Sequence, residues 1–391
     1  MIDIIKKYVK GDSKIWFIII FLCLFSLLAV FSSMGIKSHI RPGYFYMYKQ
    51  LGSILAGIFV IIVMSNIPCR YYSKFSTIFL YVSIFLLVFT IFYGENINLA
   101  TRSLVVPYLR VSIQTSEIAK IALIIYVARI LAQYQGDNEK MAKAFKPVII
   151  HTAIVTALIF KDNLSTSLLL FCVIIIMLVI SGISFKYIFG TGTVLVAMLA
   201  LLLILSPYVP FLHRGDTWIN RIENFSSGKK GDNESNYQAT QAKIAIATGG
   251  ILGKGPGNSV QRNFLPHSSS DFIYAIIAEE YGLWGPVLIL VAYFILLARI
   301  GTIVSKSKNT FPALMVIGLG FLLIIQALIN MGVSVGVIPV TGQPLPMVSW
   351  GTSSMLCTSV ALGAILSVSN QVSKKQKIEE SLTTSDEEVE C

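Results

Sequence analysis

Long uninterrupted runs of apolar residues recur along this chain and constrain its fold more than any other feature. A helix needs about 20 apolar residues to cross the hydrocarbon core of a bilayer. Ten segments are candidates: 15–35, 50–67, 74–93, 115–133, 147–161, 164–183, 187–210, 271–304, 311–331 and 348–369. Only 13% of the residues are Asp, Glu, Lys or Arg, against about 25% in a soluble domain. The runs are continuous rather than alternating, so we predict an all-α integral membrane protein with ten transmembrane helices.

The distribution of positive charge predicts the orientation of these helices. The chain has 31 Lys and Arg residues against 20 Asp and Glu, a net charge of +11. Lys and Arg concentrate in the short cytoplasmic loops of membrane proteins. In this chain they are more frequent in the short segments on the side of the two chain ends than in the short loops on the other side. We therefore predict that both termini are cytoplasmic and that 211–270 is a large extracytoplasmic loop between helices 7 and 8. The charge excess is explained by topology, so no nucleic-acid partner is predicted.

The same pattern divides the chain into an N-terminal cytoplasmic segment, 1–14, a membrane domain, 15–370, and an acidic cytoplasmic tail, 371–391. The tail lacks an apolar pattern, so we predict that it is disordered. The eighth run is too long for one span, and its first half is expected to be a tilted or partly inserted helix. Tyr237–Thr248 has helical spacing and is expected to form an amphipathic helix at the outer surface.

Charged residues at membrane depth are the first candidates for function. Glu117 and Lys120 are three residues apart, so they share one face of the fourth helix. One interpretation is an internal salt bridge that neutralises both groups. The other is a polar cavity open to the outside, with Arg102 at its mouth and an excess of positive charge that suits a phosphate or pyrophosphate.

Asp271 stands where the long loop enters the eighth run, after Ser268, Ser269 and Ser270. Serine residues followed by Asp are typical of a helix start, where a carboxylate is favoured by the helix dipole. Catalysis is the competing interpretation. Glu279 and Glu280 follow two turns later, and we expect them to avoid lipid.

Proline and glycine interrupt the segment between the ninth and tenth runs, Asn330 to Ser354. Broken backbone at membrane depth is tolerated only where it lines a cavity or is buried in protein. An ordinary loop joining two helices is the alternative. The five cysteines form no CxxC pair or Cys/His cluster, so neither a disulfide framework nor a zinc site is predicted.

Two of these segments together resemble the SEDS family of ten-span bacterial membrane proteins. The family patterns GxGxGNSVQ…LP…TDFIFAxxxEExG and PVTGxPLPxxSYGGSS correspond here to GKGPGNSVQRNFLPHSSSDFIYAIIAEEYG and PVTGQPLPMVSWGTSS. The resemblance extends from the first run to about residue 370. The GNSVQ run resembles the division member of the family more than the elongation member.

The resemblance implies a peptidoglycan glycosyltransferase that polymerises lipid II at the outer face of the bacterial plasma membrane during septal synthesis. The acid of the family's TDF motif falls on Asp271 and is expected to be catalytic. The implied substrate-binding residues are Arg102, Gln114, Ser116, Glu117, Lys120, Gln238, Ser270, Ser349 and Ser353. The chain departs from the family pattern at several positions: Ser103 replaces a Trp, Leu99 a Gly and Thr115 a Pro, and Asn163 occupies the usual place of an acid.

The implied reaction needs a base for the acceptor hydroxyl of a second lipid-linked sugar, and we assign that role to Asp271. With no second, covalent carboxylate, the α-linked donor is expected to give a β-1,4 product by inversion. A divalent cation, Mg²⁺ or Mn²⁺, on the pyrophosphate is left open, because no residue pattern argues for it. The expected partners are lipid II, membrane lipid, a class B penicillin-binding transpeptidase and other division proteins. A lipid II flippase and an elongation-type polymerase are the alternative functions.

Overall fold

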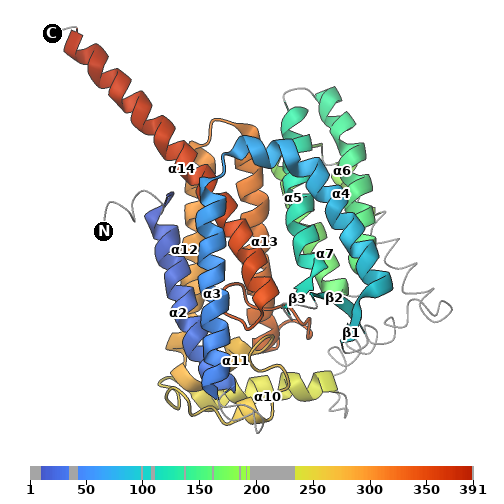
Figure 1. Ribbon diagram of the computed structural model, residues 1–391, viewed down its shortest axis with the longest axis vertical. Helices are drawn as coiled ribbons and strands as arrows, with labels where there is room; N and C mark the ends of the chain where they lie inside the picture. Colours follow the sequence, from blue (N-terminus) through green and yellow to red (C-terminus); the bar gives the residue numbers. More distant parts are fainter. Residues whose placement is uncertain are drawn as a thin grey trace.

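The computed structural model describes residues 10–34, 43–97, 100–106, 111–135, 138–160, 163–184, 186–190, 192–193 and 234–389. Long helices run side by side and form an upright bundle (Figure 1). The helices that cross it are α2 (Ser13–Met34), α3 (Gly43–Asn66), α4 (Cys69–Tyr93), α5 (Thr115–Gln133), α6 (Asn138–Phe160), α7 (Leu164–Ile180), α12 (Trp284–Lys306), α13 (Thr310–Val335) and α14 (Thr352–Val389). We call the end where α2 begins and α14 finishes the terminal end, and the other the distal end.

The length and hydropathy of these helices identify a multi-pass membrane protein. In the described part of the chain, seven helices are long and apolar enough to cross a bilayer, namely α2, α3, α4, α6, α12, α13 and α14. The fourth expected span, α5, carries Glu117, Lys120 and Arg129, and the sixth, α7, has 17 residues. The seventh expected span, 187–210, lies mostly outside the described residues. The structure therefore supports the helical bundle without fixing the number of spans at ten.

A small antiparallel sheet at the distal end departs from the predicted all-α fold. Its strands are β1 (Glu95–Ile97), β2 (Ala100–Val106) and β3 (Val111–Gln114), in the order β1-β2-β3. β1 and β3 have only three and four residues, and β2 (Ala-Thr-Arg-Ser-Leu-Val-Val) does not alternate apolar with polar residues, so hydrophobic periodicity could not reveal these strands. The sheet connects α4 to α5, and β3 runs directly into the first turn of α5.

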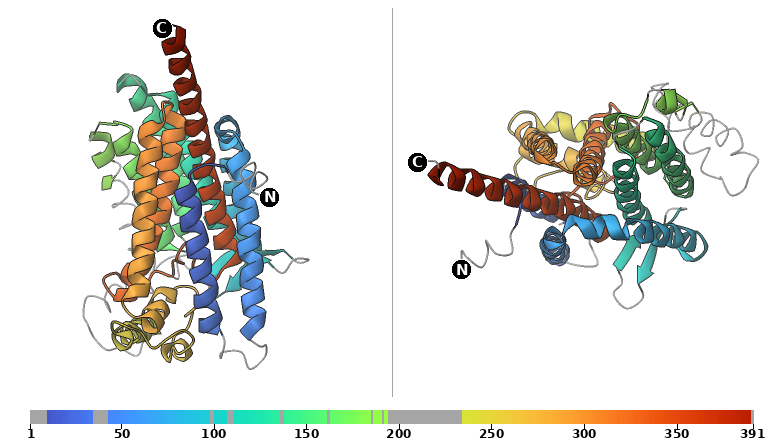
Figure 2. Two further views of the ribbon diagram at one scale, coloured as in Figure 1. Left: turned by 90° about the vertical axis from the view of Figure 1, so that its left-hand side faces the viewer. Right: turned by 90° about the horizontal axis from the view of Figure 1, so that it is seen from above.

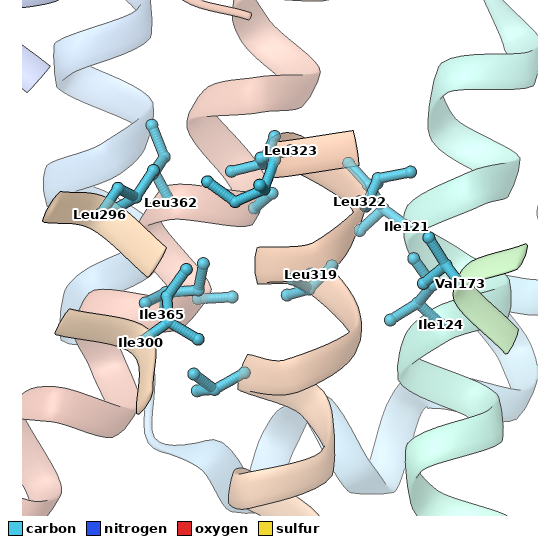
Figure 3. Close-up of a cluster of buried hydrophobic side chains, with 14 of the residues drawn as sticks. Ile121, Ile124, Val173, Leu296, Ile300, Leu319, Leu322, Leu323, Leu362 and Ile365 are labelled. Atoms are coloured by element: carbon cyan, nitrogen blue, oxygen red, sulfur yellow. The ribbon is translucent and has the colours of Figure 1, made fainter. Parts of the chain in front are cut away.

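The apolar core is organised around α13, which lies in the middle of the bundle. Figure 3 shows Leu319, Leu322 and Leu323 of α13 between two sets of side chains from its neighbours. One set comes from α5 and α7, and the other from α12 and α14: Ile121, Ile124, Val173, Leu296, Ile300, Leu362 and Ile365. A Cβ added at Gly318 would lie 2.5 Å from Ile124 Cγ2, so α13 and α5 approach closely. Polar side chains on α13 are therefore held in fixed positions.

Two shorter helices close the distal end, α10 (Glu234–Gly249) and α11 (Ile273–Tyr281) (Figures 1 and 2). The helix expected at 237–248 is present as α10, and Gln238, Ala242 and Ala245 are buried on one face. It is not clearly amphipathic, because Tyr237 and Ile244 are exposed. The overlong eighth run, whose first half was expected to be a tilted or partly inserted helix, is divided into α11 and α12, because the chain turns at Gly282 (φ 62°).

The C-terminal tail differs from its prediction. Instead of a disordered segment beyond residue 370, α14 continues to Val389 and projects beyond the terminal end (Figure 1). The buried first half of α14 supplies the costly helix nucleus, and propagation then adds one hydrogen bond per residue. A polar sequence without Gly or Pro can extend such a helix, even though it has no apolar pattern of its own.

Candidate active site

Glu117 and Lys120 form a buried ion pair in the first turns of α5. Glu117 Oε1 lies 2.7 Å from Lys120 Nζ, and the two side chains are 6% and 1% exposed. Lys120 Nζ also donates to Gln326 Oε1 of α13 at 3.2 Å. The structure therefore has the internal salt bridge of the first interpretation, and the amino group of Lys120 is engaged within the protein.

Asp271 lies on a turn before α11 and not in the helix itself. The helix begins at Ile273 with Phe272 as its N-cap, and the Phe272 side chain makes no capping hydrogen bond. The amides of Ser270 and Asp271 both donate to the carbonyl oxygen of His267, which has a positive φ of 57°. Asp271 is partly exposed. Asp271 therefore stands one residue before the N-cap position.

The segment 336–351, between α13 and α14, folds back into the bundle, and we call it the return segment. Gln326 Nε2 donates to the carbonyl oxygen of Pro344 at 3.0 Å. Gln326 stands nine residues before the end of α13, so the return segment reaches about 14 Å back along that helix. The hydroxyl of Tyr293 also donates to Pro346 O. This is broken backbone buried in protein, and not an ordinary surface loop.

Asn330, one turn after Gln326, joins the return segment to the Asp271 turn. Its Nδ2 donates to the carbonyl oxygens of Asp271 and Gln343, each at 2.8 Å. A Cβ added at Gly342 (φ 68°) would lie 3.5 Å from Asp271 Oδ2, so the carboxylate passes close to the return segment. The Gln343 side chain in turn donates to Thr166 Oγ1 of α7 at 2.6 Å. Successive turns of α13 thus connect the Glu117–Lys120 pair with Asp271.

Two of the predicted serines, Ser349 and Ser353, form hydrogen bonds in the same region. Ser349 Oγ donates to Ser270 O at 2.5 Å and accepts from the Leu345 amide at 2.7 Å. The amide of Trp350 donates to Ser269 O at 2.9 Å. Ser353 Oγ accepts from the Gln114 amide at 2.9 Å, which joins β3 to the start of α14. The backbone of the two residues before Asp271 is therefore fixed by the return segment.

The remaining predicted site residues lie around this network. Arg102 is in β2, beside Ser103, whose register partner is Gln114. Ser116 is partly exposed in the first turn of α5. Gln238 is on the buried face of α10, one turn before Ala242. The structure thus brings Ser270, Asp271 and Ser349 together, places Gln114 beside Ser353, and leaves Gln238 on a separate helix.

Glu279 and Glu280 are buried, as expected, and organise the loop after α10. Glu279 accepts from Ser259 Oγ at 2.5 Å and from the amides of Val260 and Gln261, and it forms an ion pair with Lys254. Glu280 accepts from Ser32 Oγ of α2. Burial raises the pKa of Glu280, and hydrogen bonds from Ser32 and backbone amides oppose this. A Cβ at Gly249 would lie 2.1 Å from Ala278 O, so α10 packs directly on the α11 backbone.

Several polar residues of this site were not predicted from the sequence, because the prediction relied on ionisable groups. Gln326 is a lone polar residue in a strongly apolar stretch of α13, which could have identified it. In the described part of the chain, Asn330 Oδ1, Thr341 Oγ1 and Gln343 Oε1 are buried without a hydrogen-bond partner. Buried polar atoms without a hydrogen-bond partner are rare in proteins, so each of these three needs a physical explanation. No cluster of three or more His, Cys, Asp or Glu that could hold a metal ion occurs among the described residues.

Comparison with known proteins gives matches over nearly the whole chain. The family model described as "Cell cycle protein" (FTSW_RODA_SPOVE) matches residues 12–374. A probable peptidoglycan glycosyltransferase FtsW of Coxiella burnetii is 31% identical, over 93% of this chain and 98% of its own. The FtsW relative of Bacillus subtilis is 30% identical, over 93% and 92%. The peptidoglycan glycosyltransferase MrdB of Escherichia coli K12 is 31% identical, over 91% and 93%.

Solved structures share the fold at lower sequence identity. One is a chain from a peptidoglycan synthase complex, described for its coordination of polymerization and crosslinking. Its TM-score is 0.74 at 21% identity, over 93% of this chain and 98% of that one. The crystal structure of RodA from Thermus thermophilus has a TM-score of 0.67 at 20% identity, over 93% and 98%.

Proposed function

Because the chain belongs to the cell cycle protein family named after FtsW, RodA and SpoVE, we propose that it is a peptidoglycan glycosyltransferase that polymerises lipid II. The names of its relatives support this activity. The distal end, where the site lies, is then the outer face of the bacterial plasma membrane. The enrichment of Lys and Arg at the terminal end supports this orientation.

One observation carries the catalytic assignment: the backbone of Asp271 is held in place, and the residue is partly exposed. Its backbone is fixed through Asn330, and the two preceding residues are fixed through Ser349 and Trp350. Asp271 is partly exposed, and α11 begins two residues later, at Ile273. A carboxylate fixed by its surroundings and reachable from outside is suited to take a proton from a bound substrate.

In this mechanism Asp271 accepts the proton of the acceptor sugar's 4-hydroxyl while that oxygen attacks the anomeric carbon of the donor. The bond from that carbon to the pyrophosphate breaks, and the lipid-linked pyrophosphate leaves. A single displacement inverts the anomeric centre, so an α-linked donor gives a β-1,4 bond. General base catalysis of this kind contributes about 10²–10⁴-fold to the rate.

The leaving pyrophosphate gains negative charge, which a cation near the site would stabilise. We assign this role to Arg102, whose strand is registered with the segment that leads into α5. Lys120 is neutralised by Glu117 and acts by positioning Gln326. Gln114, Ser116 and Ser353 stand at the same end of α5 and complete the substrate-binding set.

A role in division is the more specific part of the proposal. The FtsW relatives and the GNSVQ run support it, while the similarity to MrdB and RodA leaves elongation as the alternative. The similarity to a chain of a synthase complex supports pairing with a class B penicillin-binding transpeptidase at the septum.

The test is polymerisation of lipid II by the purified full-length chain in liposomes, with its transpeptidase partner if needed. Wild-type protein is expected to form glycan strands, and Asp271→Asn to lose at least 100-fold in rate with an unchanged melting temperature. Asp386→Asn, in the tail, is the matched control. Translocation of lipid II without polymer by wild-type protein would favour a flippase and contradict the proposal.

A further inference from the structure

The turn between α12 and α13, residues 307–310, has a hollow on each side at the terminal end of the bundle. Toward α14, a cavity of about 70 Å³ is lined by Lys306, Lys308 and Lys375 among others. Toward α4 and α5, a more open cavity of about 360 Å³ is lined by residues that include Arg129 and Lys308. Lys308 thus borders both hollows. Neither belongs to the Asp271 site, which lies at the other end of the molecule.

The chemistry of both hollows is that of an anion site. Among the described residues that line them, none is Asp or Glu, and the polar groups include amides and hydroxyls that can donate hydrogen bonds. Arg129 is held in position, because its NH1 donates to Thr77 Oγ1 at 2.8 Å. The guanidinium group has further donors in a planar arrangement that matches phosphate oxygens.

The start of α13 adds a second source of positive potential. Its N-cap, Asn309, lines both hollows, and its side chain makes no capping hydrogen bond. The first amides of a helix have no acceptor within the helix, and the helix dipole favours negative charge there. Pro312 lacks an amide hydrogen, so the donors of this turn are those of Thr310 and Phe311. Charged side chains and the helix start therefore favour the same ligand.

We propose that this pair of hollows, centred on Lys308, binds a phosphate group, as carried by an anionic phospholipid of the adjacent leaflet. The hollows lie where α5 and α12 end and α13 begins, at the level expected for lipid head groups. Basic pockets between transmembrane helices bind acidic head groups in this way. The proposal is independent of the catalytic activity, since no residue of the Asp271 network takes part.

The experiment measures the melting temperature of the purified full-length protein in a neutral detergent. Three probes are titrated separately: phosphatidylglycerol, zwitterionic phosphatidylcholine and inorganic phosphate. The test variant is Lys308→Gln, at an exposed position in the turn between α12 and α13. The matched control is Lys374→Gln, on an exposed part of α14 at the same end that lines neither cavity.

Phosphatidylglycerol is expected to raise the melting temperature of the wild type and of Lys374→Gln at similar concentrations. Lys308→Gln is expected to need about fivefold more lipid for the same shift. An equal response to inorganic phosphate, lost in Lys308→Gln, would support the site with free phosphate as its ligand. The proposal is overturned if Lys308→Gln responds like the control, if phosphatidylcholine acts as well as phosphatidylglycerol, or if no probe shifts the wild type.

Discussion

At the scale of single residues, Glu117 and Lys120 show how charge can be accommodated in an apolar helix. Each would be very costly to bury alone, and each is nearly inaccessible to solvent. Their mutual attraction and the Gln326 hydrogen bond offset that cost. Sequence spacing could predict the pair but could not choose between a closed salt bridge and an open cavity, because burial depends on α13.

A double-mutant comparison tests this interpretation of the pair. Glu117→Gln leaves the Lys120 charge buried without its partner and is expected to cost about 3–5 kcal/mol of unfolding free energy. Adding Lys120→Met removes that charge and should restore most of the loss. Chemical unfolding in mixed micelles measures the unfolding free energy of each single variant and of the double variant. A double variant as unstable as the sum of the two single variants would show that the pair is not self-neutralising.

Glu280 gives a prediction about pH. Burial raises its pKa in the folded protein above the value in the unfolded chain. The folded state therefore binds the proton more tightly, so this stabilising contribution is present below the unfolded pKa and is lost as pH rises through the folded pKa.

Glu280→Gln mimics the protonated form and is expected to weaken this pH dependence. Relative to wild type, the variant should gain stability over the range of pH that begins at the ordinary pKa of a glutamic acid side chain, because only the wild type has a carboxyl group that ionises more readily in the unfolded chain. Unfolding free energies of both proteins over this range provide the measurement. Parallel pH profiles would contradict the assignment.

At the scale of elements, the sequence predicted those features that are determined by a local residue pattern. The helix at 237–248 followed from its spacing. The length of the run 271–304 indicated that its first half is not an ordinary span, but the turn at Gly282 was not predicted. The sheet β1–β3 was not predicted, because β1 and β3 are short and β2 does not alternate. The extension of α14 was not predicted either, because the buried first half of the same helix nucleates it. The return segment was recognised as broken backbone, but its depth follows from Gln326 and Asn330 on α13.

Substitution of Asn330 tests the connection between α13, the return segment and the Asp271 turn. Asn330→Ala removes the hydrogen bonds that join Asp271 O and Gln343 O. We expect kcat to fall by roughly 10- to 100-fold, from the cost of freeing buried carbonyl groups, with a smaller change in KM. Polymerisation kinetics of this variant are compared with those of Asn66→Ala, an exposed Asn at the terminal end. Equal kcat in the two variants would exclude a positioning role for Asn330.

At the scale of the whole molecule, the bundle has two unlike ends. The distal end holds the sheet, α10, α11 and the Asp271 turn, while the terminal end holds both chain ends (Figures 1 and 2). An ion pair between Asp12 and Arg299 joins the start of α2 to α12 at the terminal end. Most basic residues of the described helix ends lie there: Lys14, Arg70, Lys74, Arg129, Lys146, Arg299, Lys306, Lys308, Lys374 and Lys375.

This asymmetry predicts which end faces outward. In a background with the five native cysteines replaced by Ala, Ala247→Cys on α10 should react with a membrane-impermeant maleimide in intact spheroplasts. Ser305→Cys, at the end of α12, should react only after permeabilisation. Both positions are exposed in the structure, so accessibility to reagent depends on the membrane alone. The reverse labelling pattern would invert the topology and place Asp271 on the cytoplasmic side.

The pH dependence of glycan polymerisation tests the central claim most directly. With Asp271 as the base, kcat/KM of the wild type should fall tenfold per unit as the pH is lowered through the acid limb, because only the ionised carboxylate accepts the proton. The residual rate of Asp271→Asn should be slow and flat over the same range. A variant that keeps the wild-type rate, or retains the same acid limb, would show that another group takes the proton.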